Sequence, residues 1–450
     1  MSSATEAIRK LNFIENELPK LIVQRNEFKG FEVVKCTAEF NSHLDGFMSA
    51  IYHLELTMKA PGDTKESVHN VLLKIMKGDD SFRSLTKSVQ LCCNEVHVYK
   101  EIIPFFKKYL KDNNATLFNP KDWWTPQVYF ADTGVFPELG NGKETLVALE
   151  NLKSSGYRMG PLLDLDEAHL RLMIKNIAYY HSVSYALRIR NDPMLEELAS
   201  KLVPFSFLSD NVEETGWYKR LLTLGMERFF TLIDKDSKYH FSDDFVRDAK
   251  NFKSKFFESP MVEMEKYLTR DDPFTIILHG DYVRNNVLFK YDQPEGFENP
   301  KGIKMYDFQE IRYSIPATDI SFFMFMNTPQ SKREELWEPL LEYYHENLFA
   351  SLTDILKCEL SDPRLKPYSF ENFQKHFAQY AFYGVVISLH YVPWLASPLE
   401  ETQRIAHLFE TDMNGKEFHD ITQSCGGTAV DDRIVSIVKH ASDKGYMKSF

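Results

Sequence analysis

The sequence predicts an α+β protein with two lobes, a small β-rich lobe built on five strands followed by a large helical lobe. Two observations lead to this fold class. Five strand-like segments and one long helical stretch fall within about the first 150 residues, and helical periodicity dominates most of the remaining chain up to residue 450. We therefore expect three regions: a helical extension at 1–29, a β-rich lobe at 30–150 and a helical lobe at 151–450.

Hydrophobic periodicity defines the elements of the first two regions. Residues 4–24 carry apolar side chains at helical spacing, and a long helical stretch at about 82–109 is expected to break near Pro104. The segment 48–58 alternates strictly between apolar and other positions, which is the pattern of a strand with one buried face. The expected strands are 31–38, 48–58, 71–76, 128–131 and 145–149.

The second lobe begins after a polar connector with two glycines, at 150–160. A helix is expected at 166–190, and further helices at about 195–270 and 331–450. The stretch 376–395 has no charged residue and is long enough to span a bilayer. It contains several polar side chains and a proline between charged helices, so we interpret it as a buried or half-buried helix.

Charge and cysteine content narrow the functional classes. The chain has 53 basic and 65 acidic residues and a net charge of −12, which argues against nucleic acid or an anionic membrane surface as a partner. Its five cysteines show no metal-binding spacing, and the N-terminus lacks the apolar core of a signal peptide. We expect a cytoplasmic protein with reduced thiols, no membrane span and a monomeric state.

One β-rich segment in the second lobe, 274–308, carries a set of residues suited to chemistry. A strand leads into Asp281, Asn286 follows five residues later, and a further strand at 302–306 ends at Asp307. This order places two carboxylates and an amide in one cleft. Phosphoryl transfer needs such a set, because one carboxylate accepts the proton of the acceptor hydroxyl and hard oxygen ligands hold Mg²⁺ on the phosphates. Each residue alone is weak evidence, and only the combination favours a phosphotransferase.

The pattern resembles the choline and aminoglycoside kinase branch of the protein-kinase-like superfamily, and more closely the insect ecdysteroid-kinase-like (CHK-kinase-like) family. The resemblance covers roughly residues 30–400 and implies a bilobal protein-kinase-like fold. Four segments carry it: HGDYVRNN at 279–286, YDFQ at 306–309, PATDISFFMF at 316–325 and LVALENLKSSGYRM at 146–159.

The resemblance also implies roles for individual residues. Asp281 would be the catalytic base that orients and deprotonates the acceptor hydroxyl. Asn286 and Asp307 would be the Mg²⁺ ligands, with Asp307 the principal one. His279 would organise the catalytic loop, and Asp319 would brace it through backbone hydrogen bonds.

Two charged residues of the first lobe fit the same resemblance. Lys74 lies in the apolar strand 71–76 and would contact the α- and β-phosphates of ATP. Glu95 follows 21 residues later in a helix and would pair with it. Taken without the second lobe, both residues are as well explained as ordinary surface charges.

The remaining nucleotide contacts are expected from backbone groups. Protein kinases cover the phosphates with a glycine-rich turn, whereas the corresponding stretch here, 43–49, has one glycine. Gly46 and Ser49 are the candidates for phosphate contact in this turn. The adenine is expected to bind backbone groups from about Ala148 to Glu150.

These observations favour an ATP- and Mg²⁺-dependent kinase that phosphorylates a hydroxyl of a small molecule. The resemblance suggests an ecdysteroid or another lipophilic alcohol, which includes foreign compounds, as the acceptor. The main alternative is a pseudokinase that binds nucleotide or ligand without turnover, to which the glycine-poor turn points. An aminoglycoside-type resistance enzyme fits the motifs but not the closer resemblance.

The length of chain after Asp307 bears on the acceptor class. The PATD segment at 316–319 follows almost at once, without the A-P-E motif that ends a protein-kinase activation segment. This leaves no platform for a peptide and favours a small acceptor. The aromatic-rich stretches at 320–326 and 376–395 either wall an apolar acceptor pocket or are simply core.

Overall fold

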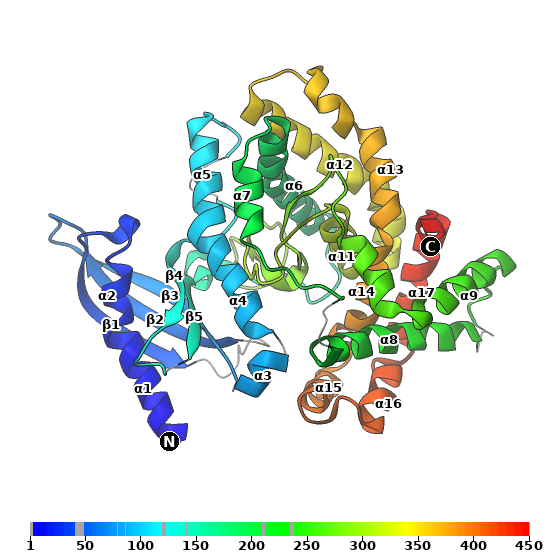
Figure 1. Ribbon diagram of the computed structural model, residues 1–450, viewed down its shortest axis with the longest axis horizontal. Helices are drawn as coiled ribbons and strands as arrows, with labels where there is room; N and C mark the ends of the chain where they lie inside the picture. Colours follow the sequence, from blue (N-terminus) through cyan, green and yellow to red (C-terminus); the bar gives the residue numbers. More distant parts are fainter. Residues whose placement is uncertain are drawn as a thin grey trace.

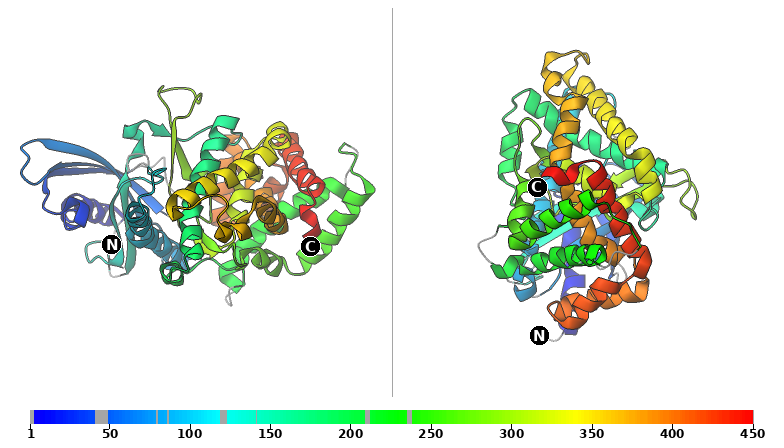
Figure 2. Two further views of the ribbon diagram at one scale, coloured as in Figure 1. Left: turned by 90° about the horizontal axis from the view of Figure 1, so that it is seen from above. Right: turned by 90° about the vertical axis from the view of Figure 1, so that its right-hand side faces the viewer.

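The computed structural model describes residues 3–40, 49–78, 80–85, 87–118, 123–140, 142–208, 212–234 and 238–449. It shows the predicted two lobes side by side, with the β-rich lobe at the left of Figure 1 and the helical lobe occupying the rest. Seen from above in Figure 2, the sheet lies at one end of the molecule and the last long helix lies toward the other. The predicted fold class is therefore confirmed.

The first lobe is built on a five-stranded antiparallel sheet with the strand order β1-β2-β3-β5-β4. The sequence predicts all five strands, but the third begins earlier than expected. Its first residues are polar and exposed, and pairing with β2 continues the strand through them, so hydrophobic periodicity could not detect that part. The strands are β1 Glu32–Phe40, β2 Ser49–Lys59, β3 Glu66–Met76, β4 Val128–Val135 and β5 Lys143–Glu150.

Helices cover both faces of this sheet. On one face α1 (Ser3–Asn16) and α2 (Leu18–Ile22) pack over the apolar side of β2, whose alternating pattern is confirmed. Alternate residues of β5 show the division. Leu146 and Ala148 belong to the core under α1 and α2, whereas Val147 and Leu149 join the core that continues into the helical lobe.

The long helix after the third strand does not break at Pro104. It runs through α4 (Ser88–His97), a π-helical turn at Val98–Ile102 and α5 (Ile103–Asp112), preceded by a short α3 (Asp80–Leu85). Proline has no N–H and would leave a gap in a regular helix. Because Pro104 lies in the first turn of α5, just after the π turn, the helix continues past it.

The helical lobe is centred on α6, α11, α12 and α14, which supply much of its buried core. Its helices are α6 Glu167–Ile189, α7 Met194–Ser200, α8 Val212–Asp234, α9 Asp243–Glu258, α10 Pro260–Glu265, α11 Ala317–Asn327, α12 Gln330–Leu356, α13 Phe370–Tyr380, α14 Phe382–Leu395, α15 Leu399–Asp412, α16 Lys416–Ser424 and α17 Gly427–Asp443.

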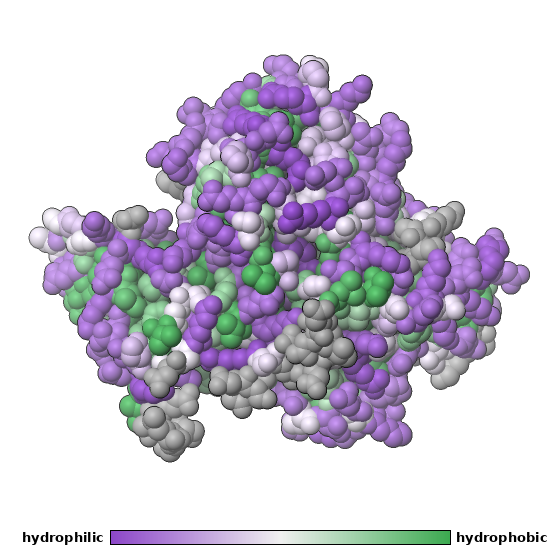
Figure 3. Space-filling model, viewed as in Figure 1, coloured by the Kyte–Doolittle hydropathy of each residue, from purple (hydrophilic) through white to green (hydrophobic). Residues whose placement is uncertain are grey.

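The uncharged stretch 376–395 is divided at Ala381 between α13 and α14, and most of its side chains are buried. Among the described helices, none combines the length and apolar composition needed to span a membrane. The face of the molecule in Figure 3 is largely hydrophilic over the helical lobe, while hydrophobic residues show over the sheet.

Short strands hold the segment that carries the candidate catalytic residues. The predicted β7 (Ile276–Leu278), β8 (Val287–Lys290) and β9 (Gly302–Met305) are present. Two further strands were not predicted: β6 (Tyr157–Arg158) pairs with β8, and β10 (Arg312–Ser314) pairs with β7. β6 and β10 are too short to show a periodicity and lack the continuous apolar run of β7, so only pairing in the fold defines them.

Close packing of α11 against α14 shapes one wall of the space between the lobes. A Cβ atom added at Gly384 of α14 would lie 2.4 Å from the backbone carbon of Ser321 in α11. The absence of a side chain therefore sets the distance between these two helices. By contrast, a Cβ atom at Gly216 of α8 would meet nothing within 4 Å.

Gly384→Ala is expected to lower the free energy of unfolding by about 1–3 kcal/mol, because the added methyl group forces two buried helices apart. Gly216→Ala should instead be neutral or stabilise the fold by up to about 1 kcal/mol, since alanine favours helix more than glycine. Urea denaturation of both variants checks this. Equal effects would show that the contact between α11 and α14 does not limit stability.

Candidate active site

A cleft of about 580 Å³ lies between the two lobes and receives residues from both. Lys74 and Leu72 of β3 enter it from the sheet. Asp281 and Asp307 enter it from the segment that the short strands hold. The other lining residues are Ile51, Pro126, Leu149, Glu150, Asn151, Leu152, Lys153, Arg158, Met159, Val283, Asn285, Asn286, Leu288, Tyr306, Phe322, Met326, Tyr391 and Leu395.

Lys74 links three separate elements at the inner end of the cleft. Its Nζ donates hydrogen bonds to Glu95 Oε2 at 2.7 Å and Oε1 at 3.0 Å, and to Asp307 Oδ1 at 3.1 Å. Burial opposes the charge of the ammonium group, but Asp307 and Glu95 together raise the pKa of Lys74 above its usual range. The lysine is therefore a permanent cation at this point, and the structure brings together the three residues named from the sequence.

The loop that carries Asp281 depends on a glycine. Gly280 has φ +88°, and a Cβ atom there would lie 1.7 Å from the backbone oxygen of Glu310. Asn286 closes the loop from its other end, because its Nδ2 donates to Asp281 Oδ2 at 2.7 Å and to the Asp281 backbone oxygen at 2.8 Å. The aspartate and the asparagine are thus fixed relative to each other.

A buried aspartate of α11 holds the start of this loop. Asp319 accepts hydrogen bonds from the backbone N–H groups of His279, at 2.8 Å, and Gly280, at 2.9 Å. Its Oδ2 also lies 3.2 Å from His181 Nε2 of α6, and His181 Nδ1 lies 2.9 Å from the Tyr344 hydroxyl. Burial lowers the pKa of His181, so the imidazole is neutral and donates one proton to Asp319.

His279 connects the loop to the strand end that carries Asp307. Its Nε2 donates to the backbone oxygen of Tyr306 at 3.1 Å, and its ring packs against Phe308 with 4.5 Å between the ring centres. The histidine is fully buried, and burial lowers its pKa. These contacts give it a positioning role within the loop rather than contact with a substrate.

The pKa of Asp281 is raised from 3.8 to about 7. Burial is the main cause, and the negative charges of Glu310 and Asp307 add to it, against the hydrogen bond from Asn286. Glu310 is itself held by Arg312, whose guanidinium donates to Glu310 Oε2 at 3.1 Å. Asp281 is consequently a carboxylate poised to take up a proton near neutral pH.

Asp307 and Asn286, the two expected metal ligands, each carry an oxygen atom that could bind a metal ion. Asp307 has φ +65°, an unusual conformation for a residue other than glycine, at the end of β9. Asn286 uses its amide nitrogen on Asp281, and its Oδ1 has no hydrogen bond in the described part of the chain. A carboxylate and an amide oxygen fit Mg²⁺, which usually takes one or two such protein ligands together with phosphate oxygens and water.

No cluster of three or more His, Cys, Asp or Glu side chains that could hold a metal ion occurs within the described residues. This agrees with the donor set above. One carboxylate and one amide do not make a complete metal cage, so phosphate oxygens would have to complete the coordination.

The other residues predicted for the nucleotide lie at different places. Glu150 lines the cleft, and its Oε2 lies 3.2 Å from Lys304 Nζ. Ala148 does not line it, because its side chain belongs to the core under α1 and α2 on the other face of the sheet. Ser49 begins β2, is buried and is also not among the lining residues. Gly46 lies outside the described residues.

Sequence reasoning missed the residues just after Glu150. Asn151, Leu152 and Lys153 line the cleft where the chain passes from the sheet to the helical lobe. The Asn151 side chain accepts from the backbone N–H of Lys153, which begins a short 3-10 turn. The connector was recognised from its polar composition, but nothing in that composition shows which of its residues turn toward the cleft.

The outer part of the cleft is apolar. Phe322 and Met326 of α11 and Tyr391 and Leu395 of α14 line it, opposite Met159. Both aromatic-rich stretches predicted from the sequence therefore contribute to this wall, and most of their other side chains are core. In each of these stretches, some residues therefore line the cleft and others belong to the core.

The five-stranded sheet, the helical lobe and the Lys–Glu–Asp arrangement between them match the bilobal fold and the contacts that the sequence motifs predicted. The chain belongs to the ecdysteroid kinase-like family, which it matches over residues 43–357. This confirms the family resemblance seen in the sequence motifs.

Several solved structures are similar to this chain at low identity. Spectinomycin phosphotransferase in complex with ADP and spectinomycin is 10% identical with a TM-score of 0.39, over 96% of this chain and 98% of that chain. Choline kinase from Cryptosporidium parvum is 13% identical with a TM-score of 0.38, over 98% and 97%. Plasmodium vivax ethanolamine kinase is 12% identical with a TM-score of 0.35, over 90% and 84%. No curated protein matches the chain in sequence.

The raised pKa of Asp281 predicts a pH-dependent effect of Asp281→Asn on stability. The folded protein holds this proton more tightly than the unfolded chain does, so ionisation costs stability as pH rises from about 4 to about 7. Asp281→Asn removes this cost. Its free energy of unfolding should rise relative to that of the wild type over this pH window, and should exceed it by about 2–4 kcal/mol above pH 7.

Denaturant unfolding between pH 5 and pH 8 measures this difference. Asp292→Asn is the matched control, because the side chain of this aspartate is 67% exposed. A gain that is the same at every pH, or that appears equally in the control, would contradict the proposed cost of the Asp281 charge.

Proposed function

We propose that this protein is an ATP- and Mg²⁺-dependent kinase that transfers a phosphoryl group to a hydroxyl of a small molecule. The observation that carries the proposal is the meeting of Asp281, Asp307 and Lys74 in one cleft, where they would serve as the base, a metal ligand and a fixed cation of phosphoryl transfer. Membership of the ecdysteroid kinase-like family supports it.

In this proposal the nucleotide binds between the sheet and the connector. Leu72 of β3 and Leu149 of β5 offer apolar surface to a base, and the connector at 150–153 lies beside them. Lys74 would hold phosphate oxygens, and Asp307 and Asn286 would hold the metal ion. Bound Mg-ATP supplies the phosphoryl group and the positive charge that stabilises it during transfer.

Asp281 would act as the base. Its carboxylate accepts the hydroxyl proton as the acceptor oxygen bonds to the γ-phosphorus and the bond to the leaving ADP oxygen breaks. The pKa of about 7 suits this task, because the group is a stronger proton acceptor than an ordinary carboxylate, yet is about half ionised at pH 7 and largely ionised above it. Asn286 orients the carboxylate through its hydrogen bond to Oδ2.

The acceptor class follows from the outer part of the cleft. Its apolar wall of Phe322, Met326, Tyr391 and Leu395 favours a lipophilic alcohol, such as an ecdysteroid or a foreign compound. The chain passes from Asp307 through β10 directly into α11, which leaves no long segment to dock a peptide. Residues 30–150 would then be the nucleotide-binding lobe, and residues 151–450 would carry the catalytic loop and the acceptor site.

All five cysteines are free thiols, which fits the reducing compartment expected for a cytoplasmic kinase.

The alternative is a pseudokinase that binds nucleotide or ligand without turnover. A protein that only binds needs no proton acceptor, so a pseudokinase should behave alike with and without the carboxylate of Asp281.

Turnover should require Asp281 and Mg²⁺. With Mg-ATP and a panel of steroid alcohols, phenols, glycosides and amino alcohols, the wild type should add one phosphate mass to at least one compound. Asp281→Asn should lower the rate by about 10²–10⁴-fold, since general-base catalysis is lost, and leave ATP binding largely intact. A chelator of Mg²⁺ should abolish the reaction. Wild type and variant that behave alike would favour the pseudokinase.

The apolar wall predicts a selective effect on the acceptor. Leu395→Ala should raise KM for a lipophilic alcohol by about tenfold, because truncation removes apolar contact from the pocket. KM for ATP should not change. Leu399→Ala is the matched control, since Leu399 is 73% exposed and does not line the cleft. An equal rise of KM for ATP would place Leu395 outside the acceptor site.

A further inference from the structure

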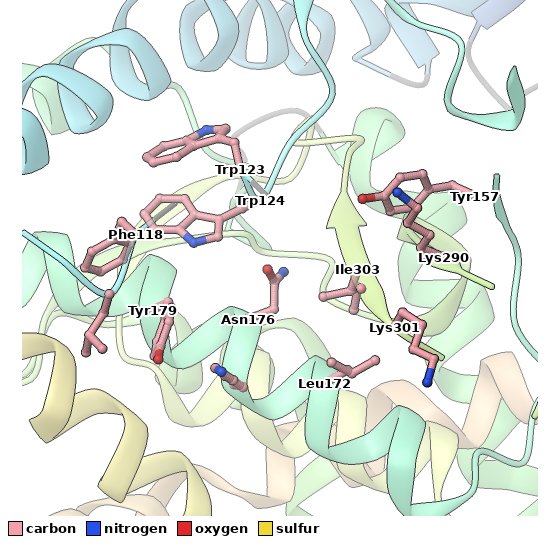
Figure 4. A pocket seen from close by; sticks show the side chains of 13 residues that line it. Phe118, Trp123, Trp124, Tyr157, Leu172, Asn176, Tyr179, Lys290, Lys301 and Ile303 are labelled. Atoms are coloured by element: carbon pink, nitrogen blue, oxygen red, sulfur yellow. The ribbon is translucent and has the colours of Figure 1, made fainter. Parts of the chain in front are cut away.

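A second cavity, of about 300 Å³, shares no lining residue with the cleft. Figure 4 shows aromatic side chains on one side of it and Tyr157, Lys290 and Lys301 on the other. The floor is formed by α6 and by β9. A volume of this size is at the lower end of the range for small-molecule sites.

The rings on the aromatic side of the cavity pack against one another. Trp123 and Trp124 stack with 4.3 Å between ring centres, and Phe118 contacts Trp124 edge-on at 5.6 Å. Tyr179 of α6 continues the wall at 5.3 Å from Phe118. Rings fixed by their own contacts offer flat apolar surface to an aromatic ligand at little cost in side-chain entropy.

Among the described residues that line this cavity, one buried side-chain atom has no hydrogen-bond partner. It is the indole nitrogen of Trp123, a residue that is 8% exposed. Asn176 of α6 is also buried, and its Nδ2 donates to the Tyr282 hydroxyl at 3.4 Å. A buried donor left unpaired favours a ligand that satisfies it.

The cavity is also lined by positive charge. Lys290 and Lys301 lie on the side away from the stacked rings, and Lys175 lies over the ring of Tyr179 on α6. No carboxylate is among the described lining residues, and of the three lysines Lys301 has Asp292 at 4.0 Å. In a protein of net charge −12, three lysines with one nearby carboxylate among the described residues create a local attraction for an anion.

We propose that this cavity is a second binding site, for a small flat aromatic molecule with one acidic group. The ring packs among Phe118, Trp124 and Tyr179, and the acid group lies toward the lysines that line the cavity, Lys175, Lys290 and Lys301. The site touches the elements that carry the candidate catalytic residues. Met305 of β9 donates its backbone N–H to the Trp124 oxygen at 2.7 Å, two residues before Asp307.

The test is a direct binding measurement that needs no turnover, so its result is independent of the kinase proposal. Calorimetric titration compares naphthalenesulfonate with neutral naphthalenesulfonamide, which has nearly the same shape. The sulfonate should bind more tightly. The double variant Lys175→Met/Lys290→Met should weaken it by about tenfold, as expected for two exposed charge contacts, and leave the sulfonamide unchanged.

Two further variants locate the site. Leu172→Trp places a larger side chain at the cavity wall and should abolish binding of both probes. Lys153→Met removes a lysine of the other cleft and should change neither. The proposal is overturned if neither probe binds, if the two probes bind equally, or if binding survives Leu172→Trp. It is also overturned if binding depends on Lys153 instead of Lys175 and Lys290.

Discussion

Crowding of negative charge around Asp281 is the constraint on which the site depends. Glu310 and Asp307 both raise the pKa of this buried carboxyl, so the cleft collects acidic groups where ionisation is costly. Fixed cations limit that cost on either side. Lys74 stands between Glu95 and Asp307, and Arg312 pairs with Glu310. The strand with Lys74, the helix with Glu95 and the loop with Asp307 must therefore each bring one charged side chain to the same place.

A layer of residues behind the cleft holds these groups without touching a substrate. Asp319 fixes the backbone of His279 and Gly280, and His181 fixes Asp319 in turn. Buried hydrogen bonds of this kind are costly to leave incomplete, so each member positions the next. The left-handed conformation of Asp307 is a further sign of constraint, since such backbone geometry persists only where surrounding structure enforces it.

The sequence predicted the parts of the site that rest on periodicity and motif. The five strands, the pairing of Lys74 with Glu95 and the approach of Asp281 to Asp307 all follow from patterns of that kind. It could not predict β6 and β10, which only pairing defines, or the continuation of the helix past Pro104. It expected the hinge contacts from Ala148 to Glu150 and did not single out the next residues of the connector, which line the cleft, because composition does not show which residues of a connector face inward.

The apolar wall and the base are physically coupled. Burial, the main cause of the raised pKa of Tyr391, is reinforced by the charge of Asp281, which places this side chain of α14 within the field of the base. The apolar wall that would suit a lipophilic ligand thus also adds to the burial that raises the pKa of Asp281. A more polar wall would lower this pKa as it admitted polar ligands. Substitutions in α11 or α14 should therefore be read through both the ligands that the cleft admits and the pKa of Asp281.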